Sequence, residues 1–146
     1  MREYVTASPE ETEALGEKIA SGLKGGEVLA LFGGMGMGKT VLARGLARGL
    51  GVREGVSSPT FALVHEYRGR LRICHYDMYR VTGWDDLAST GFFDDLSSGA
   101  VLIVEWSENI ENALPENAVR IRLRRGKTEN ERIVSIEGYT NENTGD

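Results

Sequence analysis

The stretch LFGGMGMGKT, residues 31–40, determines how the rest of the chain is interpreted. It joins an apolar run, EVLALF at 27–32, to a segment with helical periodicity, TVLARGLARGLG at 40–51. Four glycines in six positions allow the backbone N–H groups to turn inward, at φ values that other residues avoid. A strand, a glycine-rich turn and a helix in this order predict an α/β unit.

The turn also carries a complete chemical motif. Gly33-x-x-x-x-Gly38-Lys39-Thr40 matches the phosphate-binding loop pattern, with the required strand before it and helix after it. The helix adds unpaired N–H groups and the positive end of its dipole. Lys39 can reach the β- and γ-phosphates of a nucleotide, and the Thr40 hydroxyl can bind Mg²⁺. A flexible turn without a ligand is the alternative, and the full pattern argues against it. We therefore predict a nucleotide site formed by Gly33, Gly34, Met35, Gly36, Met37, Gly38, Lys39, Thr40 and Val41.

A carboxylate is needed as a second metal ligand, and two acids follow apolar strand segments. Glu105 follows AVLIV at 100–104, and Asp77 follows RICHY at 72–76. An acid at the carboxyl end of a buried strand is in the position where α/β sheets bind ligands. We assign Glu105 to the metal and Asp77 to the attacking water, and keep the reverse assignment as an alternative. Lys39, Asp77 and Glu105 are then the candidate catalytic residues.

Composition limits the class of protein. The chain has 146 residues, a formal net charge of -5 and one cysteine, Cys74. This length suits one domain, and the acidic balance argues against nucleic acid as the main partner. The N-terminus has no apolar signal region and no apolar run reaches 18 residues, so we expect neither secretion nor a membrane span. A single cysteine fits a reducing compartment, and a cytoplasmic location is predicted.

The other segments predict further strands of the same sheet. Period-two alternation and turn residues between the runs are the signals for strands and hairpins. These segments are REYVT at 2–6 as an edge strand, FALVHEY at 61–67 with RLRICHYDMYR at 70–80 as a hairpin, and AVRIRLRRG at 118–126 with ERIVSIEG at 131–138 as a terminal antiparallel pair.

Two more segments predict helices. SPEETEALGEKIASGL at 8–23 begins with a capping signature at Ser8, and GWDDLASTGFFDDLSSG at 83–99 is helical in parts. The predicted fold is a single-domain α/β, P-loop NTPase-like sheet, mixed parallel and antiparallel, flanked by helices. We expect this ATPase-like domain to span residues 1–138 and to be followed by a frayed polar tail at 139–146.

Four separated motifs occur together with the phosphate loop among them: GGMGMGKT (33–40), SSPTF (57–61), HYDMYR (75–80) and VEWSE (104–108). In this order the chain resembles the TsaE (YjeE) family, bacterial ATPases of the tRNA threonylcarbamoyladenosine pathway. The resemblance covers nearly the whole chain. It implies an ATP- and Mg²⁺-dependent protein that acts with TsaB and TsaD, which modify N6 of adenosine-37 in tRNA. The tRNA itself is then expected to be contacted only indirectly or weakly.

The resemblance also implies roles for individual residues. Gly36, Gly38, Lys39 and Thr40 would hold the phosphates, and Thr40 and Glu105 would hold Mg²⁺. Asp77 and Trp106 belong to the family's functional set, and core packing is the alternative for Trp106. Ser58, Pro59, Thr60 and Phe61 resemble a switch segment, with Thr60 as a nucleotide sensor. Thr12 and Arg132 are two further nucleotide contacts that the resemblance implies. The chain departs from the family at Gly34, where Asp is frequent.

Three functional hypotheses follow. The first is a partner-dependent ATPase. The chain offers no obvious internal arginine finger, and Arg80 is the nearest candidate. Hydrolysis by the isolated chain is therefore expected to be weak. The second is a small-molecule or nucleoside kinase, although WDDLASTGFFDDL at 84–96 offers no arginine for a lid. The third is a nucleotide-dependent scaffold that does not require hydrolysis.

Some residues have both a structural and a functional interpretation. We interpret His65 and His75 as satisfied structural histidines, since two histidines and one cysteine form no zinc pattern. For Phe92 and Phe93 two interpretations stand side by side: one of them contacts a partner, or both are buried by a loop with two covered sides. Alternation also predicts a basic strip of Arg120, Arg122 and Arg124 on one strand face, with a solvated face as the alternative.

Overall fold

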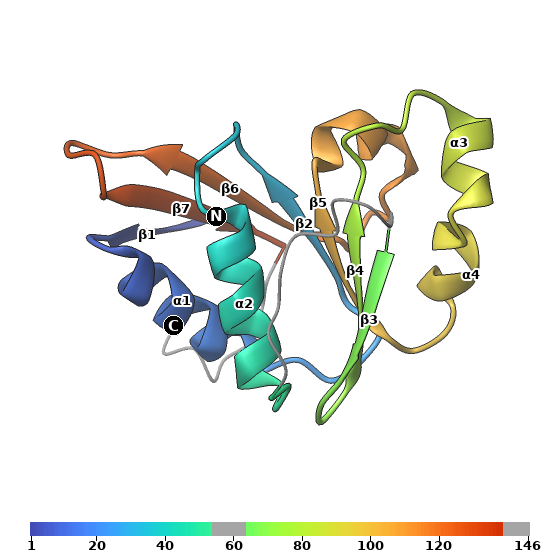
Figure 1. The fold of residues 1–146 in the computed structure, drawn as a ribbon, viewed down its shortest axis with the longest axis horizontal. Coiled ribbons are helices and arrows are strands. Elements are labelled where there is room, and N and C mark those ends of the chain that lie inside the picture. The colour runs from blue at the N-terminus through green and yellow to red at the C-terminus, as the bar shows by residue number, and fades with distance from the viewer. Residues whose placement is uncertain (54–63, 139–146) are drawn as a thin grey trace.

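The computed structural model describes residues 1–53 and 64–138. Within these ranges it contains one seven-stranded sheet and helices on both of its faces (Figure 1). The SSPTF segment with Thr60, and the predicted tail at 139–146, lie outside the described residues. The strands are β1 (Arg2–Thr6), β2 (Val28–Phe32), β3 (Val64–Arg68), β4 (Arg72–Asp77), β5 (Val101–Glu105), β6 (Val119–Arg125) and β7 (Arg132–Glu137). The helices are α1 (Pro9–Ala20), α2 (Lys39–Gly49), α3 (Trp84–Ser89), α4 (Phe92–Leu96) and the 3-10 helix η1 (Ser107–Ala113).

The strand order is β1-β7-β6-β2-β5-β4-β3. The four neighbouring strands β6, β2, β5 and β4 are parallel, while β3, β7 and β1 pair antiparallel at the two sides. The carboxyl ends of β2, β4 and β5 therefore meet at one edge, the upper edge in Figure 1. The predicted mixed α/β sheet, the β3–β4 hairpin and the terminal β6–β7 pair are confirmed.

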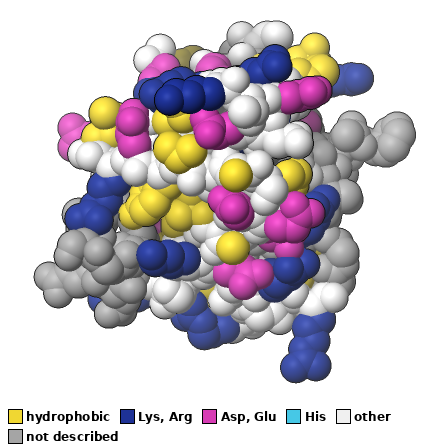
Figure 2. Space-filling view, turned by 90° about the vertical axis from the view of Figure 1, so that its left-hand side faces the viewer, with side chains coloured by type: hydrophobic (Ala, Val, Ile, Leu, Met, Phe, Trp, Pro, Cys, Tyr) yellow, Lys and Arg dark blue, Asp and Glu magenta, His cyan; other side chains and the backbone are white. Residues whose placement is uncertain are grey.

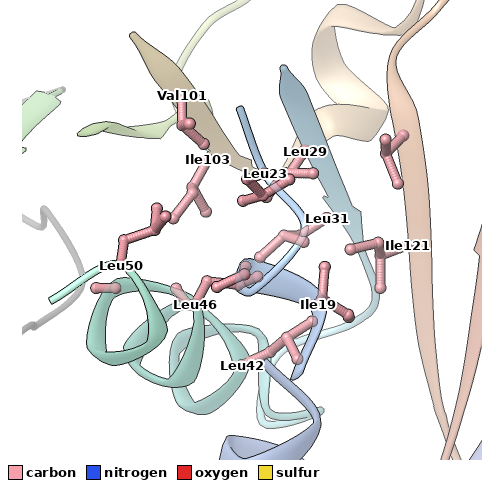
Figure 3. Packing of buried hydrophobic residues seen from close by; sticks show 14 of the residues in the cluster. Ile19, Leu23, Leu29, Leu31, Leu42, Leu46, Leu50, Val101, Ile103 and Ile121 are labelled. Carbon is pink, nitrogen blue, oxygen red and sulfur yellow. The ribbon is translucent and has the colours of Figure 1, made fainter. Parts of the chain in front are cut away.

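The sheet separates two apolar clusters. One lies between the sheet and α1 with α2, where Ile19, Leu42 and Leu46 face residues of β2, β5 and β6 (Figure 3). The other covers the opposite face and contains Phe92, Leu87 and residues around η1. Because β2 and β5 are buried on both faces, they show no polar alternation, and Glu105 at the end of β5 is their one residue that is not apolar.

Helix α1 begins where the capping signature predicts. The Ser8 side chain accepts a hydrogen bond from the Glu11 N–H at 3.2 Å, and Pro9 occupies the first helical position. The Glu11 carboxylate in turn accepts from the Ala7 N–H at 2.9 Å. Two backbone donors are thereby satisfied, as in a capping box, except that Glu11 accepts from the residue before the N-cap and not from Ser8 itself.

Helices α1 and α2 pack with their backbones in close approach. A Cβ added to Gly16 would lie 2.7 Å from the Leu42 carbonyl oxygen, and one added to Gly49 would lie 2.6 Å from Ala20 Cβ. A Cβ on Gly45 would collide with the Glu13 carbonyl oxygen. Across this seam, Arg48 forms an ion pair with Glu13. The close approach of the two helices therefore explains these glycines, because a larger residue at any of the three positions would collide with the other helix.

We expect Gly45→Ala to lower the free energy of unfolding, although alanine is the better helix former. Overpacking costs about 1–3 kcal/mol, and here the obstacle is backbone, whereas the gain in helix propensity is about 1 kcal/mol. The check is the urea midpoint at an unchanged slope. Gly83→Ala is the control, because a Cβ there meets nothing within 4 Å and the midpoint should stay near that of the wild type. Equal midpoints for all three proteins would contradict the close helix contact.

Cys74 lies in β4 with 1% of its surface exposed. Burial, with the charge of Asp95 adding to it, raises the pKa of the thiol to about 11. Because the thiolate is the reactive form, we expect a thiol reagent at pH 8 to modify the native protein at least about 100-fold more slowly than the urea-unfolded chain. Equal rates in the two states would contradict the burial of this side chain.

None of the helices in the described part of the chain has the length and apolar character that spanning a bilayer requires.

Candidate nucleotide site at the strand ends

The glycine loop lies between β2 and α2, at the edge where the parallel strands end (Figure 1). Gly36 and Gly38 have φ of 80° and 98°, in the left-handed region that favours glycine. Leu42 N–H closes the first turn of α2 on the Gly38 carbonyl at 2.9 Å. The predicted strand–loop–helix arrangement is therefore present, with the N-terminus of α2 beside the loop. Gly34, the position of the departure from the family, has open space around it, so a side chain fits there.

Lys39 is the cation of this loop and is only 5% exposed. Its Nζ donates to the Gly33 carbonyl at 2.5 Å and lies 3.7 Å from the ring centroid of Trp106. Burial lowers the pKa of the ammonium group, against the opposing effect of the charges on Glu108, Glu105 and Asp77. The ammonium group is thus held within the loop with no directly paired carboxylate among residues 1–53 and 64–138, and a bound anion would compensate for its burial.

Trp106 combines two unusual features. Its φ of 59° makes it the only non-glycine residue with positive φ in residues 1–53 and 64–138. Its ring contacts both the Lys39 ammonium and the ring of Tyr79, whose centroid is 4.9 Å away. Strain of this kind costs about 1–3 kcal/mol and persists where the surroundings impose it. The strained backbone turns the chain directly after Glu105 and positions an aromatic face against the loop lysine.

Glu105 lies at the end of β5 and is 3% exposed. Its Oε1 accepts a hydrogen bond from Thr40 Oγ1 at 3.2 Å, and its Oε2 contacts His75 Nε2 at 2.6 Å. The predicted metal ligands Thr40 and Glu105 are thus brought together. A buried carboxylate beside a hydroxyl, at the N-terminus of α2, suits a hard cation such as Mg²⁺.

The site offers Mg²⁺ few protein ligands. Within the described ranges, no three His, Cys, Asp or Glu side chains form a metal-binding group of their own. Mg²⁺ is commonly bound by one or two carboxylates together with water and substrate phosphates. The residues present therefore fit a metal that arrives with a nucleotide, and they do not fit a metal held by protein alone.

Asp77 ends β4 and is the register partner of Glu105 across the β4–β5 pair. It is half-buried, and its Oδ1 accepts a hydrogen bond from the Tyr79 N–H at 2.9 Å. Both acids thus emerge side by side from neighbouring parallel strands. Only Glu105 is joined to Thr40 by a hydrogen bond within the described residues.

Thr12 and Arg132 lie at the outer side of the loop. Arg132 donates from Nε to the Met37 carbonyl at 3.1 Å and from a terminal nitrogen to the Gly36 carbonyl at 3.3 Å. The Thr12 hydroxyl shares a hydrogen bond of 2.6 Å with the Thr6 hydroxyl. Both residues line a cavity of about 120 Å³, together with Pro9, Gly36, Gly38, Val41 and Asn130. Two candidates far apart in the sequence are therefore adjacent to the loop.

Three site residues were not predicted. Glu108 accepts a hydrogen bond from the Gly33 N–H at 3.0 Å, and Asn109 donates to the Met78 and Tyr79 carbonyls. The interpretation of His75 as a satisfied structural histidine is wrong at Nδ1 only: Nε2 has a partner in Glu105, whereas the buried Nδ1 has none within the described residues. A signal was available for Glu108, which belongs to the quoted VEWSE motif.

The predicted arginine strip of β6 borders β2, and Arg122 lies over the Phe32 ring at 4.4 Å. The predicted arginine strip of β6 is accompanied by acids: Arg124 pairs with Glu3, and Arg122 approaches Glu111. Figure 2 shows the side that carries the β6–β7 hairpin, where Lys and Arg side chains are interspersed with Asp and Glu. This strand therefore presents no uninterrupted basic surface.

The two adjacent phenylalanines have different environments. Phe92 is buried, whereas Phe93 is 38% exposed and stacks on Trp84 with 5.8 Å between ring centroids. The hypothesis of a partner contact therefore concerns Phe93 and excludes Phe92.

Comparisons with known proteins show which chains this one resembles. The family model described as "Threonylcarbamoyl adenosine biosynthesis protein TsaE" matches residues 6–134. A Treponema pallidum protein named tRNA threonylcarbamoyladenosine biosynthesis protein TsaE is 38% identical over 120 residues, covering 82% of this chain and 89% of that protein. A Bacillus subtilis protein of the same name is 37% identical over 130 residues, covering 88% and 81%. The crystal structure of Bacillus subtilis YdiB superposes with a TM-score of 0.80 and 33% identity, covering 95% of this chain and 86% of that one.

Proposed function

Because the chain belongs to the TsaE family, we propose that it serves in the biosynthesis of threonylcarbamoyladenosine in tRNA, where it binds and hydrolyses ATP with Mg²⁺. The observation that carries the nucleotide part is the contact between Thr40 and Glu105 beside the glycine loop, with the Lys39 ammonium in the same loop. A cytoplasmic location is part of this proposal.

Each residue has a defined task in this proposal. The loop N–H groups and Lys39 bind the β- and γ-phosphates, and Thr40 and Glu105 hold the metal. A metal held there together with the nucleotide would supply positive charge beside the phosphates. Asp77, beside Glu105 at the strand ends, orients the attacking water. Thr12 and Arg132 line the adjacent cavity and contact the rest of the nucleotide.

We further propose that hydrolysis depends on the partner proteins TsaB and TsaD. Arg80, the candidate internal finger, is exposed and has no hydrogen-bond or ion-pair partner among the described residues that would direct it toward the loop. Arg132 donates to loop carbonyls. A missing arginine finger costs about 10³–10⁵ in rate, so the isolated chain should be a slow ATPase. The exposed Phe93–Trp84 pair is a candidate contact for such a partner.

The test is steady-state ATP hydrolysis by the purified chain, with and without the cognate TsaB–TsaD pair. Slow turnover that rises on addition of the pair supports the proposal. Equal turnover in both conditions would contradict partner dependence and would favour the kinase or the scaffold hypothesis. Phosphate transfer to a small-molecule acceptor would favour the kinase.

A further inference from the structure

We propose that His75 is a positioning residue: its imidazole holds the Glu105 carboxylate in the orientation that binds the metal of the metal–nucleotide complex. The inference rests on the proposed function, because it concerns the same site. It assigns a task to a buried histidine that the phosphate-loop motif does not explain.

The contact joins two fully buried side chains. His75 is 1% exposed and Glu105 is 3% exposed, and Nε2 lies 2.6 Å from Oε2. The other carboxylate oxygen, Oε1, accepts from Thr40 at 3.2 Å. The carboxyl group is therefore fixed at both oxygens, by β4 on one side and by the first turn of α2 on the other. This restricts its rotation about the terminal side-chain bond.

The imidazole makes its side-chain hydrogen bond on one side only. Nδ1 is buried and has no hydrogen-bond partner within the described residues. The contact of Nε2 with Glu105 Oε2 is therefore the hydrogen bond that joins this ring to its surroundings, and it places the ring against the carboxylate.

The strand geometry places both groups on one face. His75 and Asp77 are two residues apart on β4, so their side chains lie on the same face, the one that α2 covers. Glu105 is the register partner of Asp77 on β5. One buried strand thus carries the positioning histidine and the acid assigned to the water. Groups that orient a metal-binding side chain typically contribute 10- to 100-fold to metal affinity or activity.

The experiment compares His75→Gln with His75→Asn. The glutamine amide nitrogen reaches about as far from the backbone as Nε2 and can still donate to Glu105, whereas the asparagine amide is too short. Both variants place an amide at the same buried position, and asparagine differs from glutamine by one methylene group. Calorimetry measures ADP binding in EDTA, and the paramagnetic signal of Mn²⁺ measures metal binding to the protein–ADP complex.

We expect His75→Asn to weaken Mn²⁺ binding by about 10- to 100-fold and His75→Gln to retain most of the affinity. ADP affinity in EDTA should stay within about twofold of the wild type in both variants. Ile73→Val controls for loss of core packing, since Ile73 lies on the same strand and face and is buried. It should lower stability and leave Mn²⁺ affinity unchanged.

Two outcomes overturn the inference and can be told apart from failure of the proposed function. Equal Mn²⁺ affinity in His75→Asn and the wild type would show that the contact does not position Glu105. Parallel losses of ADP and Mn²⁺ binding in both variants would show a general structural role. A wild-type protein that binds neither ADP nor Mn²⁺–ADP would instead contradict the nucleotide site itself, and the inference with it.

Discussion

Replacing Lys39 with methionine is expected to weaken ATP binding by about 10- to 100-fold without lowering the stability of the nucleotide-free protein. Hydrogen bonds to a charged group contribute about 1.5–3 kcal/mol, and about 1.4 kcal/mol corresponds to a factor of ten in affinity. Methionine keeps an unbranched side chain and removes the ammonium group, with its hydrogen bond to the Gly33 carbonyl and its contact with Trp106. The loss should therefore appear in binding.

The expected stability follows from the direction of the pKa shift. Burial lowers the pKa of Lys39 below its ordinary value of 10.5, so the unfolded chain binds this proton more readily than the folded chain. The ammonium group therefore costs stability at all pH values below its lowered pKa. This cost decreases as the pH rises through that pKa toward 10.5. At pH 7 the methionine variant should unfold at the same or a higher urea concentration than the wild type.

Isothermal titration with ATP and urea unfolding together test this prediction. Lys18→Met is the matched control, because Lys18 is exposed in the last turn of α1, away from the loop. The control should bind ATP like the wild type. A Lys39→Met protein that binds ATP normally, or that is strongly destabilised without nucleotide, would contradict a phosphate-binding role for this lysine.

The parts of the fold that could be predicted depend on residues close together in the sequence. The cap at Ser8 is a hydrogen bond to a residue three positions later, and the glycine loop is one continuous segment. Asp77 and Glu105 could be predicted for the same reason, because each directly follows an apolar strand segment in the sequence. Their position at the strand ends follows from chain order once the strands are parallel.

Contacts across the sheet could not be predicted. The contact between His75 and Glu105 depends on the β4–β5 register, in which Asp77 is paired with Glu105. A shift of one residue would move His75 to the opposite face. The sequence alone shows a single histidine in an apolar strand. From the sequence alone, Gly45 is expected only to weaken its helix. The structure explains the glycine, because the backbone of α1 leaves no room for a Cβ at this position.

Glu105→Gln is the second substitution with a large expected effect. We expect Mg²⁺-dependent ATP hydrolysis to fall about 100-fold or more, the size of loss typical when one electrostatic group at a reacting centre is removed. Binding of ATP in EDTA should be unchanged or tighter, because a negative charge near the phosphates is gone. Glutamine keeps the shape of the buried side chain, so the protein should remain folded.

Asp77→Asn is the matched comparison and separates the two possible assignments of the acids. If Glu105 holds the metal, Glu105→Gln should raise the Mg²⁺ concentration needed for half-maximal activity, by about 10-fold or more. Asp77→Asn should lower the rate at saturating Mg²⁺ and leave that concentration unchanged. The reverse pattern would assign the metal to Asp77.

The geometry favours Glu105 as the metal ligand and Asp77 as the residue that acts on the rate. A metal at the N-terminus of α2 must be reached by the Thr40 hydroxyl, and Glu105 already accepts a hydrogen bond from that hydroxyl at 3.2 Å. Asp77 uses one oxygen to accept from the Tyr79 N–H, which directs the carboxyl group toward the following turn. Titrating both variants with Mg²⁺ at saturating ATP measures the difference directly. If both retain wild-type half-saturation and rate, neither acid acts in hydrolysis, and the scaffold hypothesis becomes the better one.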